Sequence, residues 1–217
     1  ALLCLGLALG VREQQKHQIE SSAAARWAWR ELPAPFKRYM VVVALFTLGN
    51  SSNMFLLLRA REVGVSEAQI PLLWAAVSAV ATLFSTPLSA WSDRVGRVRL
   101  LAAGYLAYAL FYVAMGALGE SRWWLYALFG FYGLFMAATE GVEKALVADL
   151  APVDRQGSAY GWFNLTAGLF LLPASVSFGW LYQQVSPAAA FGFSAACAAL
   201  AALLLTLWVR AECQRLS

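Results

Sequence analysis

The sequence predicts an all-α integral membrane protein built as a bundle of six transmembrane helices. Of its 217 residues, 61% are hydrophobic and only 13% are charged, whereas a soluble globular domain has about 25% charged residues. A bilayer core about 30 Å thick is crossed by about 20 apolar residues in helical conformation, and several uncharged stretches of the chain reach that length. We therefore expect lipid to cover most of the surface.

The six expected spans follow one another at short intervals. The last two come from a single run without a charged residue, from Gln156 to Val209, which the polar segment 183–187 divides by a turn that ends in proline. The spans are expected at residues 39–58, 70–92, 100–119, 123–147, 159–182 and 188–209. Together they form a membrane bundle at 39–209.

The segments on either side of the bundle differ in composition. Residues 1–11 are an apolar run with no methionine and no basic region in front of it, so we interpret them as the tail of a preceding transmembrane helix. The hydrophilic residues 12–38 are predicted to be a cytoplasmic linker. Alternatively, part of this linker, residues 21–31, is a short helix that binds the lipid surface or a partner. Residues 210–217 are predicted to be a cytoplasmic tail.

The positive charges predict the orientation of the bundle. If the spans alternate, the segments 12–38, 93–99 and 148–158 and the C-terminus share one side, and they hold twelve Lys and Arg residues against three on the other side. Because loops rich in Lys and Arg stay in the cytoplasm, we expect these segments to be cytoplasmic in a multi-pass protein of the cell (inner) membrane. The net charge of +4 then requires no nucleic-acid partner.

Histidine and cysteine usage argues against several classes of function. His17 is the only histidine and lies in a polar segment, while Cys4, Cys197 and Cys213 show neither metal-site nor disulfide spacing. Metal centres and acyl-transfer sites in proteins commonly depend on histidine. We therefore expect no catalytic site, no metal and no cofactor, and hence no enzyme.

The loop between the second and third expected spans is short and charged. It reads Asp93-Arg94-Val95-Gly96-Arg97. Gly96 permits a tight reversal of the chain, and Asp93 can accept hydrogen bonds from the arginines beside it. Such a cluster can latch one pair of helices against another, although a plain basic turn would have the same composition.

A second pattern follows the fourth expected span, and the two loops together resemble the signature loops of the major facilitator superfamily. The second pattern consists of Asp149-Leu150-Ala151-Pro152, Arg155, Gln156, Gly157, Ala159 and Gly161. The first span, with Gly49-Asn50-Ser51-Ser52 ahead of residues 55–61, is also similar to bacterial drug and metabolite transporters of that superfamily. The resemblance covers essentially the whole chain, aligned with the end of helix six and helices seven to twelve.

Three positions depart from the family pattern. Ser89 stands where the family usually has a glycine, four residues before the acidic residue. Val98 interrupts the pair of basic residues that normally follows the loop glycine, and Gln156 replaces an arginine. The departures leave the expected fold unchanged.

The resemblance implies a secondary active transporter, in which this chain is the C-terminal half of a twelve-helix protein. Such a transporter moves a small solute, by uptake or efflux, through alternating access. The implied partners are membrane lipid, the N-terminal six-helix half of the same chain and a small-molecule substrate, with proton coupling as a family-level expectation. The alternative is a non-transporting membrane binding or scaffold protein with the same fold.

The resemblance also implies a cytoplasmic gate. In this family the two signature loops meet when the transporter is open to the outside, and opening to the inside separates them. The expected gate residues are Asp93, Arg94, Gly96, Arg97, Asp149 and Arg155.

Polar residues within the spans predict the substrate or coupling pathway. Glu140, Glu143 and Lys144 are ionisable groups in the fourth span, and such groups are costly in a membrane and therefore indicate function. They are interpreted either as gate charges or as groups that bind substrate or a proton. Because they are four residues apart, Glu140 and Lys144 can pair on one helix face.

Two amides in the first span are the deeper candidates. Asn50 lies near the middle of the membrane when counted at about 1.5 Å per residue from the start of the span. Asn53 is expected to share its helix face. Both amides are predicted to face the substrate, which transporters of this kind bind near the midplane. The alternative is that they form hydrogen bonds between helices.

Overall fold

The computed structural model of the chain describes residues 29–119 and 121–210. The expected tail at 1–11, the part of the linker from residue 12 to residue 28 and the tail from residue 211 lie outside these described residues. The linker ends in a 3₁₀ turn, η1 (Trp29–Glu31), and the first long helix already begins at Ala34, five residues before the expected start of the first span.

The described chain is helical and contains no strand. Its first part comprises α2 (Ala34–Gly49), α3 (Met54–Glu62), α4 (Ile70–Val95) and α5 (Arg97–Gly116). Its second part comprises α6 (Arg122–Leu150), the 3₁₀ turn η2 (Val153–Arg155), α7 (Gln156–Gln184), α8 (Pro187–Leu204) and the π-helical turn η3 (Leu205–Arg210).

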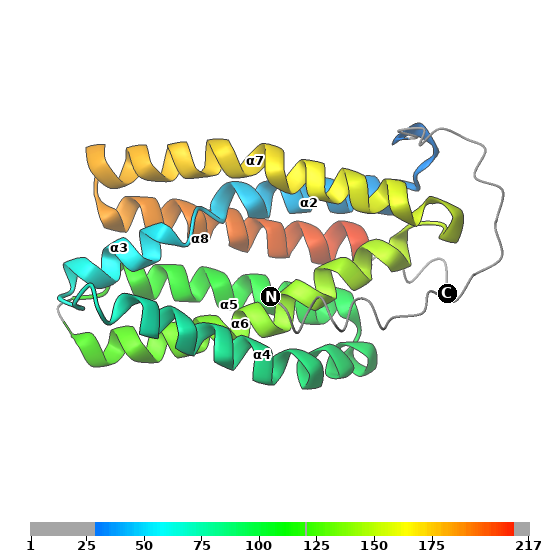
Figure 1. Cartoon of the computed structure of the whole chain (residues 1–217). Coiled ribbons are helices and arrows are strands. Elements are labelled where there is room, and N and C mark those ends of the chain that lie inside the picture. The colour runs from blue at the N-terminus through cyan, green and yellow to red at the C-terminus, as the bar shows by residue number, and fades with distance from the viewer. Residues whose placement is uncertain (1–28, 120, 211–217) are drawn as a thin grey trace, which may run out of the picture.

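Six helical segments of the described chain are long and apolar enough to cross a membrane, when α2 is joined with α3 and α8 with η3. This finding confirms the predicted all-α bundle of six spans. The helices lie side by side, with the α4–α5 and α6–α7 turns at one end and the α3–α4, α5–α6 and α7–α8 turns at the other (Figure 1). We call the end with the α4–α5 and α6–α7 turns the basic end, because Arg94, Arg97 and Arg99 lie at the α4–α5 turn.

The first span is interrupted, and here the sequence-based prediction of one continuous helix is wrong. α2 stops at Gly49 and α3 starts at Met54, with Asn50 in a non-helical conformation (φ −93°, ψ 77°). Asn50 and Asn53 therefore do not share a helix face. The segment between them is rich in Gly, Asn and Ser, residues that favour caps and turns over helix interiors.

Hydrogen bonds compensate for the break within the bundle. A backbone group left unpaired in a membrane costs several kcal/mol, on the order of 2–7. The backbone N–H of Asn50 donates to the Phe46 carbonyl oxygen at 2.9 Å, and the Tyr108 hydroxyl donates to the Gly49 carbonyl oxygen at 3.1 Å. The backbone N–H of Met54 donates to the Ser52 hydroxyl at 3.3 Å. The interruption is therefore a built feature with its own bonds.

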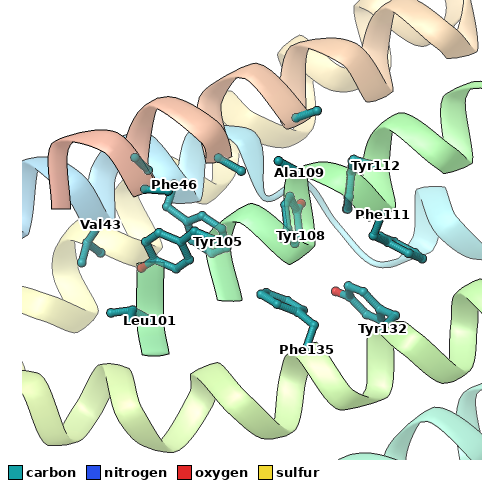
Figure 2. Close-up of a cluster of buried hydrophobic side chains, with 14 of the residues drawn as sticks. Val43, Phe46, Leu101, Tyr105, Tyr108, Ala109, Phe111, Tyr112, Tyr132 and Phe135 are labelled. Atoms are coloured by element: carbon teal, nitrogen blue, oxygen red, sulfur yellow. The ribbon is translucent and has the colours of Figure 1, made fainter. Parts of the chain in front are cut away.

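Aromatic rings fill the centre of the bundle around α5. This helix buries Tyr105, Tyr108 and Tyr112 completely. Phe46 of α2 stacks on Tyr105 with ring centroids 3.8 Å apart, and the rings of Tyr108 and Tyr112 stack at 4.1 Å (Figure 2). Because α5 packs against both α6 and α8, this row of rings joins the two sides of the bundle.

Glycines allow α4 and α6 to lie very close together. A Cβ atom added to Gly133 of α6 would lie 2.9 Å from the Val77 carbonyl oxygen of α4, and one added to Gly141 would lie 2.9 Å from the Ser89 hydroxyl oxygen. Real Cβ atoms do not approach other atoms this closely. The absence of two side chains on α6 therefore fixes how α4 sits along it.

The outer faces of α4 and α7 are the least covered part of the bundle. Large apolar side chains project from both helices, and they include Leu72, Leu83, Phe84, Leu169, Leu172 and Val176. An exposed apolar surface of this extent marks contact with lipid or with another protein surface. Residues of both helices also line the cavity described next.

Candidate functional site

A cavity of about 660 Å³ lies beside the break in the first span. Its walls come from α2, the break itself, α3, α4, α6 and α7. Small-molecule sites usually have volumes of about 300–1,000 Å³ and combine apolar walls with a few polar groups. This cavity has that size and that composition.

Four of the five predicted pathway residues line the same cavity. Asn50 and Asn53 reach it from the break, and Glu140 and Glu143 reach it from α6. Lys144, the fifth, does not line it. The structure thus brings the two amides and the two carboxyl groups together although the first span is not one helix.

The two carboxyl groups have different surroundings. Glu143 is half-buried, and its Oε1 accepts a hydrogen bond from the Tyr105 hydroxyl at 3.0 Å. Glu140 is exposed on the cavity side, and within the described residues no hydrogen bond or ion pair joins it to Lys144. The predicted pairing of Glu140 with Lys144 is therefore absent from this arrangement.

The side-chain amides of Asn50 and Asn53 both form hydrogen bonds between helices and both line the cavity. The Tyr132 hydroxyl of α6 donates to the Asn53 Oδ1 at 2.8 Å, and the Tyr108 hydroxyl of α5 lies 3.3 Å from the Asn50 Oδ1. The Asn53 oxygen thus accepts a bond from α6, and the Asn50 oxygen shares the one Tyr108 proton with the Gly49 carbonyl oxygen. Each residue also lines the cavity. These bonds fix the orientation of both amides relative to α5 and α6.

Charged residues meet at the basic end around Arg97. The Arg97 guanidinium lies 2.6 Å from an Asp149 carboxylate oxygen of α6 and 3.1 Å from an Asp93 carboxylate oxygen of α4. It also donates to the Ala145 carbonyl oxygen at 2.9 Å. One planar side chain therefore ties the α4–α5 turn to the end of α6, as a guanidinium with several donors can do.

The turn that holds Arg97 depends on Gly96. Its φ angle is +98°, a backbone region that residues with a Cβ atom rarely adopt. Arg94, from the same turn, is exposed and lines a separate hollow of about 600 Å³ beside Asp93 and Asp149. Among the described residues Arg94 makes no ion pair.

Arg155 lies apart from this cluster. It forms ion pairs with Glu31 of η1 and with Asp154 of η2, the latter at 3.1 Å. Next to it, the rings of Trp29 and Trp162 lie 4.8 Å apart. These contacts form a clasp, Glu31–Arg155 with Trp29–Trp162, that fastens the end of the linker to the start of α7.

A second polar cluster occupies the opposite end of the bundle. Glu62 of α3 accepts a hydrogen bond from the Tyr182 hydroxyl of α7 at 2.7 Å and pairs with Arg59 at 3.1 Å. Arg59 also donates to the Leu118 carbonyl oxygen at 2.7 Å. The short helix α3 is thereby fixed to α7 and to the end of α5.

The family profile described as Major Facilitator Superfamily matches residues 39–215 of the chain. The chain belongs to the major facilitator superfamily. As a major facilitator protein with six apolar spans, it is a multi-pass membrane protein.

Similar curated proteins are known from an archaeon and from mycobacteria. An uncharacterized MFS-type transporter of Methanocaldococcus jannaschii is 36% identical over 183 residues, which are 81% of this chain and 45% of that protein. Uncharacterized proteins of Mycobacterium bovis and Mycobacterium tuberculosis are 28% identical over 169 residues, which are 75% of this chain and 38% of each protein. The chain thus spans less than half the length of these relatives.

Several residues of this major facilitator chain were missed by the sequence reasoning. Tyr132, Met136 and Thr139 line the cavity with Glu140 and Glu143. Their spacing of three or four residues along α6 was the available signal, because such residues share a helix face.

Two further contacts could not be predicted from the sequence. Trp74 reaches the cavity from α4, and Glu31 reaches Arg155 from the linker. Their partners are distant in sequence, and no periodicity links them.

Proposed function

We propose that the protein is a secondary active transporter that moves a small solute by alternating access, and that this chain is its C-terminal six-helix half. The observation that supports this most directly is the polar cavity within the spans, lined by Glu140, Glu143, Asn50 and Asn53. Ionisable groups at such a depth mark a substrate or ion pathway. The process is conformational, and no covalent bond is made or broken.

The second element of the proposal is a gate at the basic end formed by Arg97, Asp149 and Asp93. The side chains of Arg97 and Asp149 are 28% and 51% exposed, so their ion pair stabilises the closed gate by only about 1 kcal/mol or less. A contact of this strength can close one end of the cavity and still break in each cycle. We propose that the basic end faces the cytoplasm, as the positive charges favour.

The third element is a second six-helix half that covers the open side of the cavity. Glu140 is exposed and lines the cavity, and lipid cannot solvate a carboxylate. The chain spans less than half the length of its curated relatives, which leaves room for such a half in the whole protein. The apolar faces of α4 and α7 would pack against it.

Cysteine accessibility tests alternating access without knowledge of the substrate. Ser175 of α7 lines the cavity, and Ser66 lies in the α3–α4 turn at the opposite end. In a cysteine-free version of the full-length protein, Ser175→Cys should react with a membrane-impermeant maleimide from both faces of the membrane. The control, Ser66→Cys, should react from one face only.

The proposal is wrong if Ser175→Cys reacts from a single face under all conditions, including addition of candidate solutes and of a membrane potential. That outcome would favour a fixed binding or scaffold protein with the same fold.

A further inference from the structure

The charged residues that the described part of the chain contributes to the cavity all have the same sign. Among the described residues that line it, Glu140 and Glu143 are acidic, and none is Lys, Arg or His. Lys144, the nearest basic residue in sequence, lies outside the lining. The other basic residues of the described part lie in turns or close to the end of a helix. In a site of low dielectric constant, such one-sided charge attracts cations and repels anions.

Aromatic rings form part of the apolar wall, beside Met54, Leu57, Met136, Leu171 and Leu172. Phe46, Trp74, Tyr132 and Phe135 all line the cavity. Trp74 and Tyr132 lie 6.4 Å apart between ring centroids, and Tyr132 and Phe135 lie 5.6 Å apart, in both cases tilted instead of stacked. Tyr132 and Phe135 can be followed in Figure 2. The faces of such rings attract a cation through their quadrupole, and most strongly those of tryptophan.

The two carboxyl groups differ in how free they are to bind a ligand. The Tyr105 hydroxyl donates to one carboxyl oxygen of Glu143 at 3.0 Å. Glu140 has no hydrogen bond or ion pair to any described residue and is exposed. An incoming charged group would therefore meet Glu140 first.

From the cavity volume, the aromatic wall and the one-sided charge, we infer that the substrate is an organic cation with aromatic or bulky apolar substituents. Glu140 binds its positive charge, and Trp74 and Tyr132 contact its apolar groups. Asn50 and Asn53 contribute neutral polar contacts. This inference deepens the proposed function and rests on it, because it names the substrate class of the same cavity.

Two ions of nearly identical size and shape but opposite charge provide the test. Tetraphenylphosphonium is a cation and tetraphenylborate is an anion. Binding of each radiolabelled ion to the full-length protein in nanodiscs is measured by scintillation proximity, with nanodiscs that lack protein as the baseline for lipid partitioning. We expect saturable binding of the cation that excess unlabelled cation displaces and no saturable binding of the anion.

Substitutions then locate the binding charge. Glu140→Gln should weaken cation binding by about tenfold or more, because it removes a partly desolvated charge pair, and Glu140→Asp should retain most of the binding. The matched control is Glu67→Gln, at an exposed residue that pairs with Arg61 at 2.7 Å outside the cavity. It should bind like the parent protein.

The inference is overturned if the anion binds as well as the cation, if neither ion shows saturable binding, or if Glu140→Gln binds the cation with parental affinity. None of these results affects the labelling of Ser175→Cys from both faces. Failure of the substrate class and failure of alternating access are therefore separate outcomes.

Discussion

Gly141 and Ser89 meet at the contact between α4 and α6. A Cβ atom on Gly141 would come within 2.9 Å of the Ser89 hydroxyl oxygen. The family pattern usually has its glycine at the position of Ser89, on the other helix. In this chain the glycine is on α6 and the larger side chain, that of Ser89, is on α4. The Ser89 hydroxymethyl group occupies the space that the glycine leaves free.

We predict that Gly141→Ala destabilises the protein and that Ser89→Gly restores its stability. Overpacking of a tight contact costs about 1–3 kcal/mol, and removal of the Ser89 side chain would make room for the new methyl group. Thermal unfolding of the single and double variants in detergent measures the coupling. If the double variant is no more stable than Gly141→Ala alone, the two residues do not share this space. Gly130→Ala is the control, because a Cβ atom there meets nothing within 4 Å.

At the gate, Arg97 has more partners than any other residue of the cluster. We predict that Arg97→Gln and Asp149→Asn each raise labelling of Ser175→Cys from the basic end by about fivefold, as loss of a contact of about 1 kcal/mol would do. Arg97→Lys should not restore the closed gate, because an ammonium group cannot bridge two carboxylates and a carbonyl oxygen with one planar fork.

The control for the gate is Arg99→Gln, an exposed residue of the same loop that should leave the labelling unchanged. Equal effects of Arg97→Gln and Arg99→Gln would mean that net charge, and not the Arg97–Asp149 pair, controls access.

The helix α3 is a short element held by few contacts. It is nine residues long, is separated from α2 by the break and is fixed by the bonds of Glu62 and Arg59. An isolated helix of this length is unstable. The position of α3 therefore depends strongly on these few contacts.

We predict that Tyr182→Phe loosens α3 without unfolding the bundle. The lost hydrogen bond to Glu62 contributes about 1–3 kcal/mol, since its acceptor is charged. Backbone amides of residues 54–62 should then exchange with deuterium about fivefold or more faster, whereas those of α5 and α8 should not change. Tyr160→Phe is the control, because that hydroxyl bonds to the Lys144 carbonyl oxygen at the basic end. Unchanged exchange in α3 would show that other contacts hold it.

The sequence predicted the six spans but not the break in the first of them. Uncharged length predicted all six spans, because the bilayer imposes a minimum run of apolar residues. It could not reveal the break at residues 50–53, because Asn and Ser carry no charge and a scan for charges passes over them. The composition Gly49-Asn50-Ser51-Ser52-Asn53 was the available signal, and it was interpreted as a family resemblance instead of a helix end.

The candidate site was predictable to a similar degree. The ionisable residues of α6 were chosen for their cost in a membrane and the amides of the first span for their depth, and the structure places four of these five residues in one cavity. Trp74 could not be chosen in this way, because a tryptophan in a span is ordinary and only packing shows which face it occupies. Arg155 was grouped with the gate by its motif, whereas the structure pairs it with the linker residue Glu31.

For the whole molecule, we predict that the basic end lies in the cytoplasm. Alkaline phosphatase, which is active only outside the cytoplasm, can be fused to the full-length protein truncated after chosen turns. Fusions after Gly119 and Val185, at the opposite end, should be active in a bacterial host, and fusions after Gly96 and Val153 should be inactive. The reverse pattern would overturn the orientation and place the Arg97 cluster on the outside.

The clasp between the linker and the start of α7 has a consequence for biosynthesis. Glu31 and Trp29 leave the ribosome before the first span of the bundle, whereas Arg155 and Trp162 follow only after the fourth. During translation Arg155 and Trp162 are therefore not yet present while the first four spans enter the membrane, and the linker cannot form these contacts. Closure of the clasp becomes a late event, and the end of the linker acquires its folded position only when α7 is being inserted.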